Sequence, residues 1–181
     1  SAGVRVPVLM YHAVGDDCWG EESLFVKPEE LEKQLQYLSE NGYETIFFED
    51  LSHIEQYEKP VLLTFDDGYD DNAETLLPLL RKYGMKATIF AIGVSFGTDH
   101  YKDTGYAITP HFGAAEAAEM TASGLISIQS HTYDMHQWPP YETGSAVREN
   151  ILQLSSESEE AYVQALTEDF TRSRALLEGA T

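Results

Sequence analysis

Hydrophobic and polar positions along the chain fall into alternating blocks, and these blocks predict strands and helices in turn. Short apolar runs predict strands at residues 6–11, 44–48, 61–65, 87–92 and 125–128. The first run is of the kind that is buried on both faces of a parallel sheet. Apolar residues that return every three or four positions predict helices at residues 28–41, 72–83, 114–123 and 158–178. The alternation indicates an α/β fold with a parallel sheet, either open or closed into a barrel.

Residues at the predicted helix ends agree with this assignment. Pro28 suits the first turn of a helix, whereas Pro78 makes the 72–83 helix irregular or delays its start. Ser156 and Glu159 match a capping box before the last helix. Glycines follow three of the helices, where C-terminal caps are expected: Gly42, Gly84 and Gly124.

Length and composition predict one domain, residues 1–181, because a chain of this size with 43% hydrophobic residues can bury a sizeable core. Lysine and arginine total 11 against 31 aspartates and glutamates, which gives a net charge of −20. Such a surface repels phosphate backbones, so nucleic acid is not an expected partner. The oligomeric state is left open by the sequence.

Two features bear on the compartment. Cys18 is the single cysteine, so neither an internal disulfide nor a cysteine-pair metal site can form. The apolar stretch 4–10 is interrupted by Arg5 and Pro7 and is too short to span a bilayer or to form the core of a signal peptide. We therefore expect neither a membrane span nor a targeting segment in this chain.

Candidate chemistry begins where the 61–65 strand ends. That strand runs directly into Asp66 and Asp67, and Gly68 lets the backbone turn. In parallel α/β folds, the carboxyl ends of the strands form the rim at which chemistry takes place. Successive side chains at a strand end point in different directions, so one carboxylate can bind a metal while the other faces substrate and water.

A second polar cluster, residues 130–136, follows the 125–128 strand and contains His131 and His136. Imidazole nitrogen suits zinc and its neighbours, and two histidines with one carboxylate leave open positions for water and substrate. Taken alone, adjacent aspartates are more often a turn or a helix cap, and loop histidines are more often surface groups. At equivalent strand ends of one alternating fold, the two clusters support each other and predict a metal site.

These residues resemble the polysaccharide deacetylase family, the NodB-homology carbohydrate esterases. The resemblance covers nearly the whole chain, from residues 8–12 through the highly specific stretch 64–68 to residues 124–126 and 130–134. It implies a distorted (β/α) barrel of the NodB-homology type, here shortened at its C-terminal end. It also implies a metal-dependent hydrolase, extracellular or in the cell envelope, that removes N-acetyl groups from an N-acetylglucosamine-containing polysaccharide and releases acetate.

By this resemblance, Asp66 corresponds to the catalytic base. The metal ligands implied are Asp67, His131 and His136. The expected cofactor is a divalent metal, zinc first, with cobalt, nickel, manganese and iron as alternatives. The common family form has its second histidine where this chain has Met135, and His136 comes one residue later. That spacing resembles the branch that acts on poly-β-1,6-N-acetylglucosamine.

The chain ends before the arginine–proline motif of the family and before the later motif that carries the general acid. His12, at the end of the 6–11 strand, is a candidate for the missing acid or for a supporting structural role. Thr132 is a further candidate for supporting the site or contacting substrate. The remaining histidines fall in predicted loops and are expected at the surface: His53, His100 and His111.

Two other functions fit parts of this pattern. Two histidines and a carboxylate also form the ligand set of non-haem iron oxygenases, although Asp66 has no role in that chemistry. A non-catalytic glycan-binding or pseudoenzyme module could keep the metal site without the acid. Oxygen-dependent turnover with iron would indicate the first, and glycan binding without acetate release would indicate the second.

Overall fold

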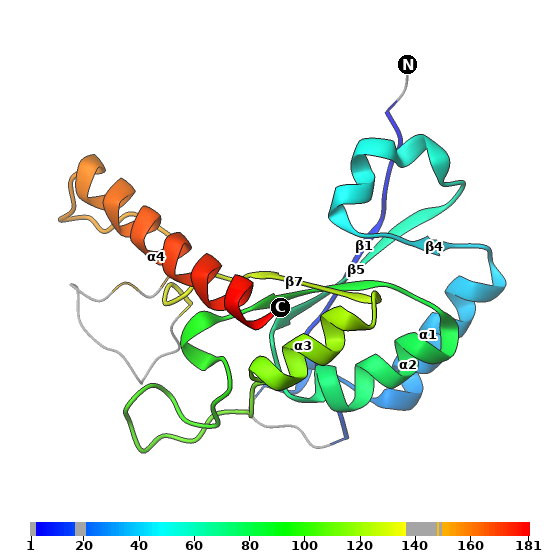
Figure 1. The fold of residues 1–181 in the computed structure, drawn as a ribbon, viewed down its shortest axis with the longest axis horizontal. Helices are drawn as coiled ribbons and strands as arrows, with labels where there is room; N and C mark the ends of the chain where they lie inside the picture. The colour runs from blue at the N-terminus through cyan, green and yellow to red at the C-terminus, as the bar shows by residue number, and fades with distance from the viewer. Residues whose placement is uncertain (1–2, 17–20, 137–147, 149) are drawn as a thin grey trace.

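The computed structural model describes residues 3–16, 21–136, 148 and 150–181, so the prediction for Cys18 lies outside the described residues. Its main sheet is parallel and runs in the order β1-β5-β6-β7 (Figure 1). The strands of this sheet are β1 (Val8–Tyr11), β5 (Pro60–Asp67), β6 (Ala87–Ala91) and β7 (Ile126–Ser130). A short strand, β4 (Glu44–Thr45), pairs with the start of β5. The predicted α/β fold with a parallel sheet is confirmed.

Helices α1 (Pro28–Glu40), α2 (Leu77–Tyr83) and α3 (Ala114–Ala122) lie together on one side of the sheet (Figure 1). The leucine spacing of α1 predicted its buried face, which consists of Leu31, Leu35 and Leu38. Alternate residues of the strands face these helices and complete the core, among them Val61, Leu63 and Phe65. This packing holds the carboxyl ends of β5, β6 and β7 next to each other.

The last helix, α4 (Glu159–Ala180), begins away from the main sheet and reaches the core near its C-terminal end through Leu177 (Figure 1). Its N-cap is Ser158, whose hydroxyl accepts a hydrogen bond from the Ala161 N–H at 3.2 Å. The prediction of a capping box at Ser156 is therefore wrong by two residues. A cap side chain must reach the N–H two or three residues ahead, and the helix begins only at Glu159.

Pro78 acts as the sequence predicts, because α2 begins at Leu77 and has this proline in its first turn. A π-helical turn, η3 (Asn72–Leu76), precedes it. The predicted 44–48 strand is shorter than expected and ends at Thr45. The Asp50 carboxylate accepts a hydrogen bond from the Phe47 N–H at 2.9 Å, and the chain turns there into a 3₁₀ helix, η2 (Phe48–Gln56).

The first strand is also not buried on both faces, as its apolar sequence predicted. β1 lies at an edge of the main sheet, where Val8 is 51% and Met10 is 65% exposed. Position in the sheet, rather than the composition of the strand, decides this exposure.

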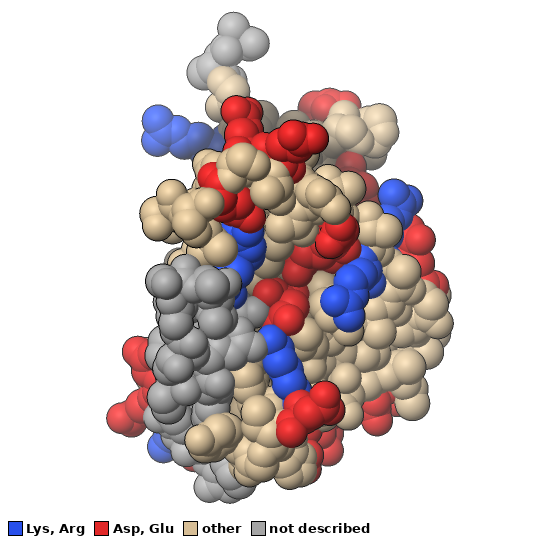
Figure 2. Space-filling model, turned by 90° about the vertical axis from the view of Figure 1, so that its left-hand side faces the viewer, with Lys and Arg blue, Asp and Glu red and all other residues tan. Residues whose placement is uncertain are grey.

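Shorter elements fill the connections between the larger ones: β2 (Ala13–Val14), η1 (Glu22–Leu24), β3 (Phe25–Val26) and η4 (Gly93–Ser95). Acidic side chains are scattered over the face drawn in Figure 2, in agreement with the net charge of −20. Among the described residues, no helix combines the length and the apolar composition that crossing a bilayer requires.

Candidate metal centre

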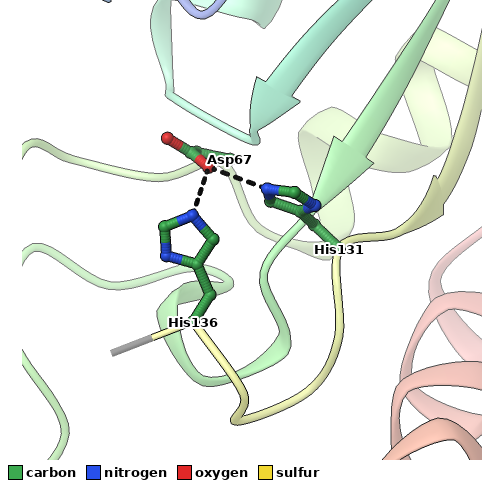
Figure 3. A group of neighbouring side chains, drawn as sticks. All are labelled: Asp67, His131 and His136. Atoms are coloured by element: carbon green, nitrogen blue, oxygen red, sulfur yellow. Dashed lines mark ion pairs between the residues drawn. The ribbon is translucent and has the colours of Figure 1, made fainter. Parts of the chain in front are cut away.

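Two strand ends bring the predicted metal ligands together. Asp67 is the last residue of β5, His131 follows β7 directly, and His136 lies five residues further on. Figure 3 shows both imidazole rings directed at the same carboxylate. The Asp67 Oδ1 atom lies 3.4 Å from His131 Nε2 and 3.7 Å from His136 Nε2. The three side chains therefore form one cluster, in which one ligand atom of each lies within 4.8 Å of the others.

The spacing of these atoms fits a shared cation better than a hydrogen bond. Charge-assisted N–H···O bonds are about 2.7–2.9 Å long, shorter than either contact. Ligands held tetrahedrally at 2.0–2.1 Å from zinc lie roughly 3.3 Å from each other. The Asp67 Oδ1 atom is buried and has no hydrogen-bond partner among the described residues. A buried carboxylate oxygen without a partner is costly, and a divalent cation at this position would satisfy it.

The backbone at Asp67, the last residue of β5, has an uncommon conformation. Its φ of 81° lies in the left-handed region, and Gly68 follows with a φ of 86°. A Cβ at Gly68 would lie 3.1 Å from the Ala91 Cβ, so the close approach of β5 and β6 there favours glycine. Non-glycine residues in the left-handed region are uncommon and cluster at functional sites.

Tyr69 holds the other oxygen of the same carboxylate. Its hydroxyl donates a hydrogen bond of 3.0 Å to Asp67 Oδ2. Burial, followed by the negative charge of Asp67, raises the pKa of Tyr69 well above its usual value, so this donor stays protonated. Tyr69 is not among the residues predicted from the sequence, although its position two residues after Asp67 was a usable signal.

Asp66 lies beside the cluster in a different environment. Its Oδ2 atom is 4.0 Å from His12 Nε2, and the two side chains are 16% and 19% exposed. Burial raises the pKa of Asp66, while the charges of His131 and His12 oppose this shift. Burial also lowers the pKa of His131, which favours the neutral imidazole that binds metals. The two adjacent aspartates thus point in different directions, as expected: Asp67 faces His131 and His136, whereas Asp66 lies beside His12.

A cavity of about 390 Å³ opens over this cluster. Its polar lining comes from several segments of the chain and includes His12, Glu21, Asp67, Tyr69, His111 and His136. The cavity is therefore large enough to admit part of a small-molecule or sugar ligand beside the candidate metal ligands.

The prediction that His111 lies at the surface is wrong, because this residue is only 9% exposed. The loop that carries it folds back on β5, so that His111 forms an antiparallel bridge with Tyr69 and their rings lie 4.9 Å apart. Burial lowers the pKa of His111 to about 4. No local signal identifies this burial, since it depends on a contact between distant segments. His53 and His100 are exposed, as predicted.

Thr132 shapes the loop between the two histidines. Its N–H donates to Ser130 Oγ at 3.0 Å, and its own Oγ1 accepts a hydrogen bond from the Met135 N–H at 3.1 Å. Its φ of 68° lies in the left-handed region, which is uncommon for a residue other than glycine. As a result Met135 is buried at 6% exposure, and His136, one residue later, reaches Asp67.

Several known proteins resemble this chain in sequence. The family model for polysaccharide deacetylase matches residues 53–180. YxkH of Bacillus subtilis (strain 168), a proposed polysaccharide deacetylase, is 42% identical over 135 residues, which cover 72% of this chain and 43% of YxkH. The poly-beta-1,6-N-acetyl-D-glucosamine N-deacetylase of Escherichia coli (strain K12) is 27% identical over 143 residues, 71% of this chain and 20% of that protein. The chain therefore spans less than half the length of these relatives.

A solved structure extends the match to the fold. A de-N-acetylase from Aggregatibacter actinomycetemcomitans superimposes with a TM-score of 0.76 and 25% sequence identity, covering 97% of this chain and 74% of that one. Such a neighbour confirms the fold of the NodB-homology type. From the matched family model and the level of identity, we conclude that the chain belongs to the polysaccharide deacetylase family.

Proposed function

We propose that this chain is the metal-dependent catalytic part of a polysaccharide N-deacetylase, in which residues 1–181 fold as one domain. The observation that carries the proposal is the buried Oδ1 atom of Asp67, which has no hydrogen-bond partner among the described residues and faces His131 and His136. Family membership favours hydrolysis of an N-acetyl group over the oxygenase chemistry that the same ligand set could support.

In this proposal Asp67, His131 and His136 hold a divalent cation, with zinc favoured because the ligands are two imidazoles and one carboxylate. Cobalt, nickel, manganese and iron are alternatives for the same donor set. Such a cation, when bound, makes water more acidic and polarises the acetamide carbonyl. Three protein ligands leave room in the coordination sphere for water and substrate.

Asp66 and His12 would handle the protons. Asp66 accepts a proton from the water whose oxygen attacks the acetyl carbonyl carbon, and the C–N bond then breaks. The leaving nitrogen needs a proton, and His12 lines the same cavity, with its Nε2 atom 4.0 Å from Asp66. We assign His12 the role of donor, so that the amine stays on the sugar and acetate leaves.

The proposed substrate is an N-acetylglucosamine-containing polysaccharide. Support comes from the Escherichia coli relative, whose name specifies poly-beta-1,6-N-acetyl-D-glucosamine, and from the position of His136 beside Asp67. A location outside the cell or in the cell envelope goes with such a substrate. A panel of N-acetylated oligosaccharides, with β-1,4 and β-1,6 linkages, would identify the glycan through acetate release.

Metal content and acetate release, measured on the same purified variants, test the assigned roles. We expect Asp67→Ala and His131→Ala to lose the bound metal. Asp66→Asn and His12→Ala should keep the metal but lose acetate release by about a hundredfold or more, because each removes one proton-transfer group. His53→Ala changes an exposed histidine and serves as the control for histidine loss.

Equal metal content in all of these variants would contradict the assigned roles. Binding of the glycan with metal present but with no acetate released, in the protein extended to its full length, would instead favour the non-catalytic glycan-binding module.

A further inference from the structure

The two candidate histidine ligands sit at the ends of one short segment, the histidine loop (residues 131–136). On one side this loop is fastened to η4 by two backbone hydrogen bonds. The Gly93 N–H donates to the Thr132 carbonyl at 3.0 Å, and the Val94 N–H donates to the Tyr133 carbonyl at 2.8 Å. These bonds use carbonyl groups of the loop and leave the N–H groups at its centre to other partners.

Those N–H groups are bound by a carboxylate from the distant helix α4. Asp169 accepts a hydrogen bond from the Tyr133 N–H at 2.8 Å through Oδ1 and from the Asp134 N–H at 2.7 Å through Oδ2. The side chain is only 7% exposed, although the chain is strongly acidic. A buried carboxylate is costly unless hydrogen bonds compensate its charge, and these two donors provide that compensation.

The contact lies at the centre of the segment that carries both ligands. Tyr133 is two residues after His131, and Asp134 is two residues before His136. Neighbouring contacts strengthen the attachment: the Ser173 hydroxyl donates to Ser130 Oγ at 2.6 Å, and the Arg172 guanidinium lies 4.1 Å from the centre of the Tyr133 ring. A shift of the two central N–H groups would therefore move both imidazoles relative to Asp67.

We propose that Asp169 is a positioning residue, which holds the histidine loop in the geometry that lets His131 and His136 bind one cation together with Asp67. The role rests on the proposed function, because it concerns the same metal site. Metal ligands must be held within about 0.5 Å of their productive positions by groups that do not themselves touch the metal. α4 thereby controls metal affinity although it contributes no ligand.

Asp169→Asn tests this role with little change in side-chain volume. The amide keeps one acceptor oxygen, but its NH₂ group faces a backbone N–H, so one of the two loop contacts is lost. We expect the affinity for Co²⁺, measured by titration against a chelator, to fall about 10- to 100-fold, with an altered visible absorption spectrum of the bound Co²⁺.

Two control variants on α4 separate positioning from general destabilisation. Glu168→Gln makes the same chemical change at the neighbouring, exposed position. Leu177→Ala removes a buried core contact of the same helix, which lowers the melting temperature, and keeps the Asp169 carboxylate. Both should bind Co²⁺ with the wild-type affinity and spectrum.

Hydrogen exchange on the metal-free wild-type protein provides a measurement that does not depend on a folded variant. The Tyr133 and Asp134 amides should be protected even without metal, and unprotected exchange at both would overturn the proposal. Equal Co²⁺ affinity and spectra in the wild type and Asp169→Asn would overturn the role of Asp169 alone. A wild-type protein that binds no Co²⁺ would overturn the metal site and this role together.

Discussion

Asp67 presents its two carboxylate oxygens to different partners. Oδ2 accepts the Tyr69 hydroxyl hydrogen bond, whereas Oδ1 is buried and faces the two histidines. The left-handed backbone at Asp67, with a φ of 81°, lets the strand end turn without losing the pairing of β5 with β6. Because one oxygen is already held, the carboxylate has one orientation in which it can meet a cation.

Tyr69→Phe should therefore weaken metal binding without unfolding the protein. The substitution removes the hydroxyl that donates to Asp67 but keeps the ring that packs against His111 and Phe25. We expect the affinity for zinc to fall about tenfold or more, measured by competition with a chelator.

A matched control is Tyr83→Phe, which removes a tyrosine hydroxyl bonded to the Glu32 carboxylate at 3.0 Å, between α2 and α1. This variant should bind zinc as the wild type does. Equal losses in both variants would mean that the Tyr69 hydroxyl does not orient Asp67.

At the scale of the elements, η4 approaches the histidine loop closely. A Cβ added at Gly93 would lie 2.4 Å from the Tyr133 Cδ2 atom and 2.8 Å from its Cα atom. Glycine lets the two segments form the backbone hydrogen bonds that connect them. Both elements follow parallel strands that pair with each other, β6 and β7, so the sheet brings their starting points together.

Gly93→Ala should push the histidine loop away from η4. We expect a loss of about 1–3 kcal/mol in the free energy of unfolding, typical of an overpacked position, together with weaker metal binding. Urea unfolding and zinc titration would measure the two effects.

Gly105→Ala is the control, because an added Cβ there meets nothing within 4 Å. It should leave both quantities unchanged. If Gly93→Ala instead kept the stability and metal affinity of the wild type, the histidine loop would tolerate the added Cβ, and the close contact with η4 would not be needed.

At the scale of the whole molecule, the excess of acidic groups makes stability depend on pH. Asp71 is a partly buried example: desolvation raises its pKa to about 6, and hydrogen bonds from the Val14 N–H and the Asn72 side chain only partly oppose this shift. In a chain of net charge −20, ionising a further, partly buried carboxylate is unfavourable. The folded state therefore keeps this proton to a higher pH than the unfolded state does.

This difference predicts that the contribution of Asp71 to stability falls as the pH rises from about 4 to 6, whereas that of His111, whose pKa is lowered to about 4, rises. Below the unfolded pKa both states are protonated, and above about 6 the folded state must carry the buried charge. A difference of about 2 in pKa corresponds to a loss of roughly 3 kcal/mol in the free energy of unfolding across this range. Relative to the wild type, Asp71→Asn should therefore gain about this much stability as the pH rises through this range, measured by urea unfolding at a series of pH values.

The exposed Asp103 provides the control, since Asp103→Asn changes one carboxylate without changing a buried group. Its profile should follow that of the wild type. An Asp71→Asn profile as steep as the wild type would assign the pH dependence to other groups.

Much of the fold and of the candidate site could be predicted because the relevant signals are local. The apolar faces of α1 and the strands follow from periodicity, and the start of α2 follows from the backbone limits of Pro78. The polar clusters at the ends of β5 and β7 could be recognised because each occupies consecutive residues, and parallel strands place such ends on one rim. Neighbouring residues thus determined most of the elements and marked the two polar clusters, and the resemblance to the polysaccharide deacetylase family then pointed to Asp67, His131 and His136 as the ligands.

Only the tertiary structure decided how these residues meet and what supports them. The exposure of Met10, the burial of His111 and the attachment of the histidine loop to Asp169 all depend on contacts between segments far apart in the chain. Periodicity and spacing report the neighbours of a residue along the chain, whereas burial and hydrogen-bond partners depend on how the elements pack. For this reason the sequence determined which residues are candidates, and packing decided their distances, their environments and the groups that hold them.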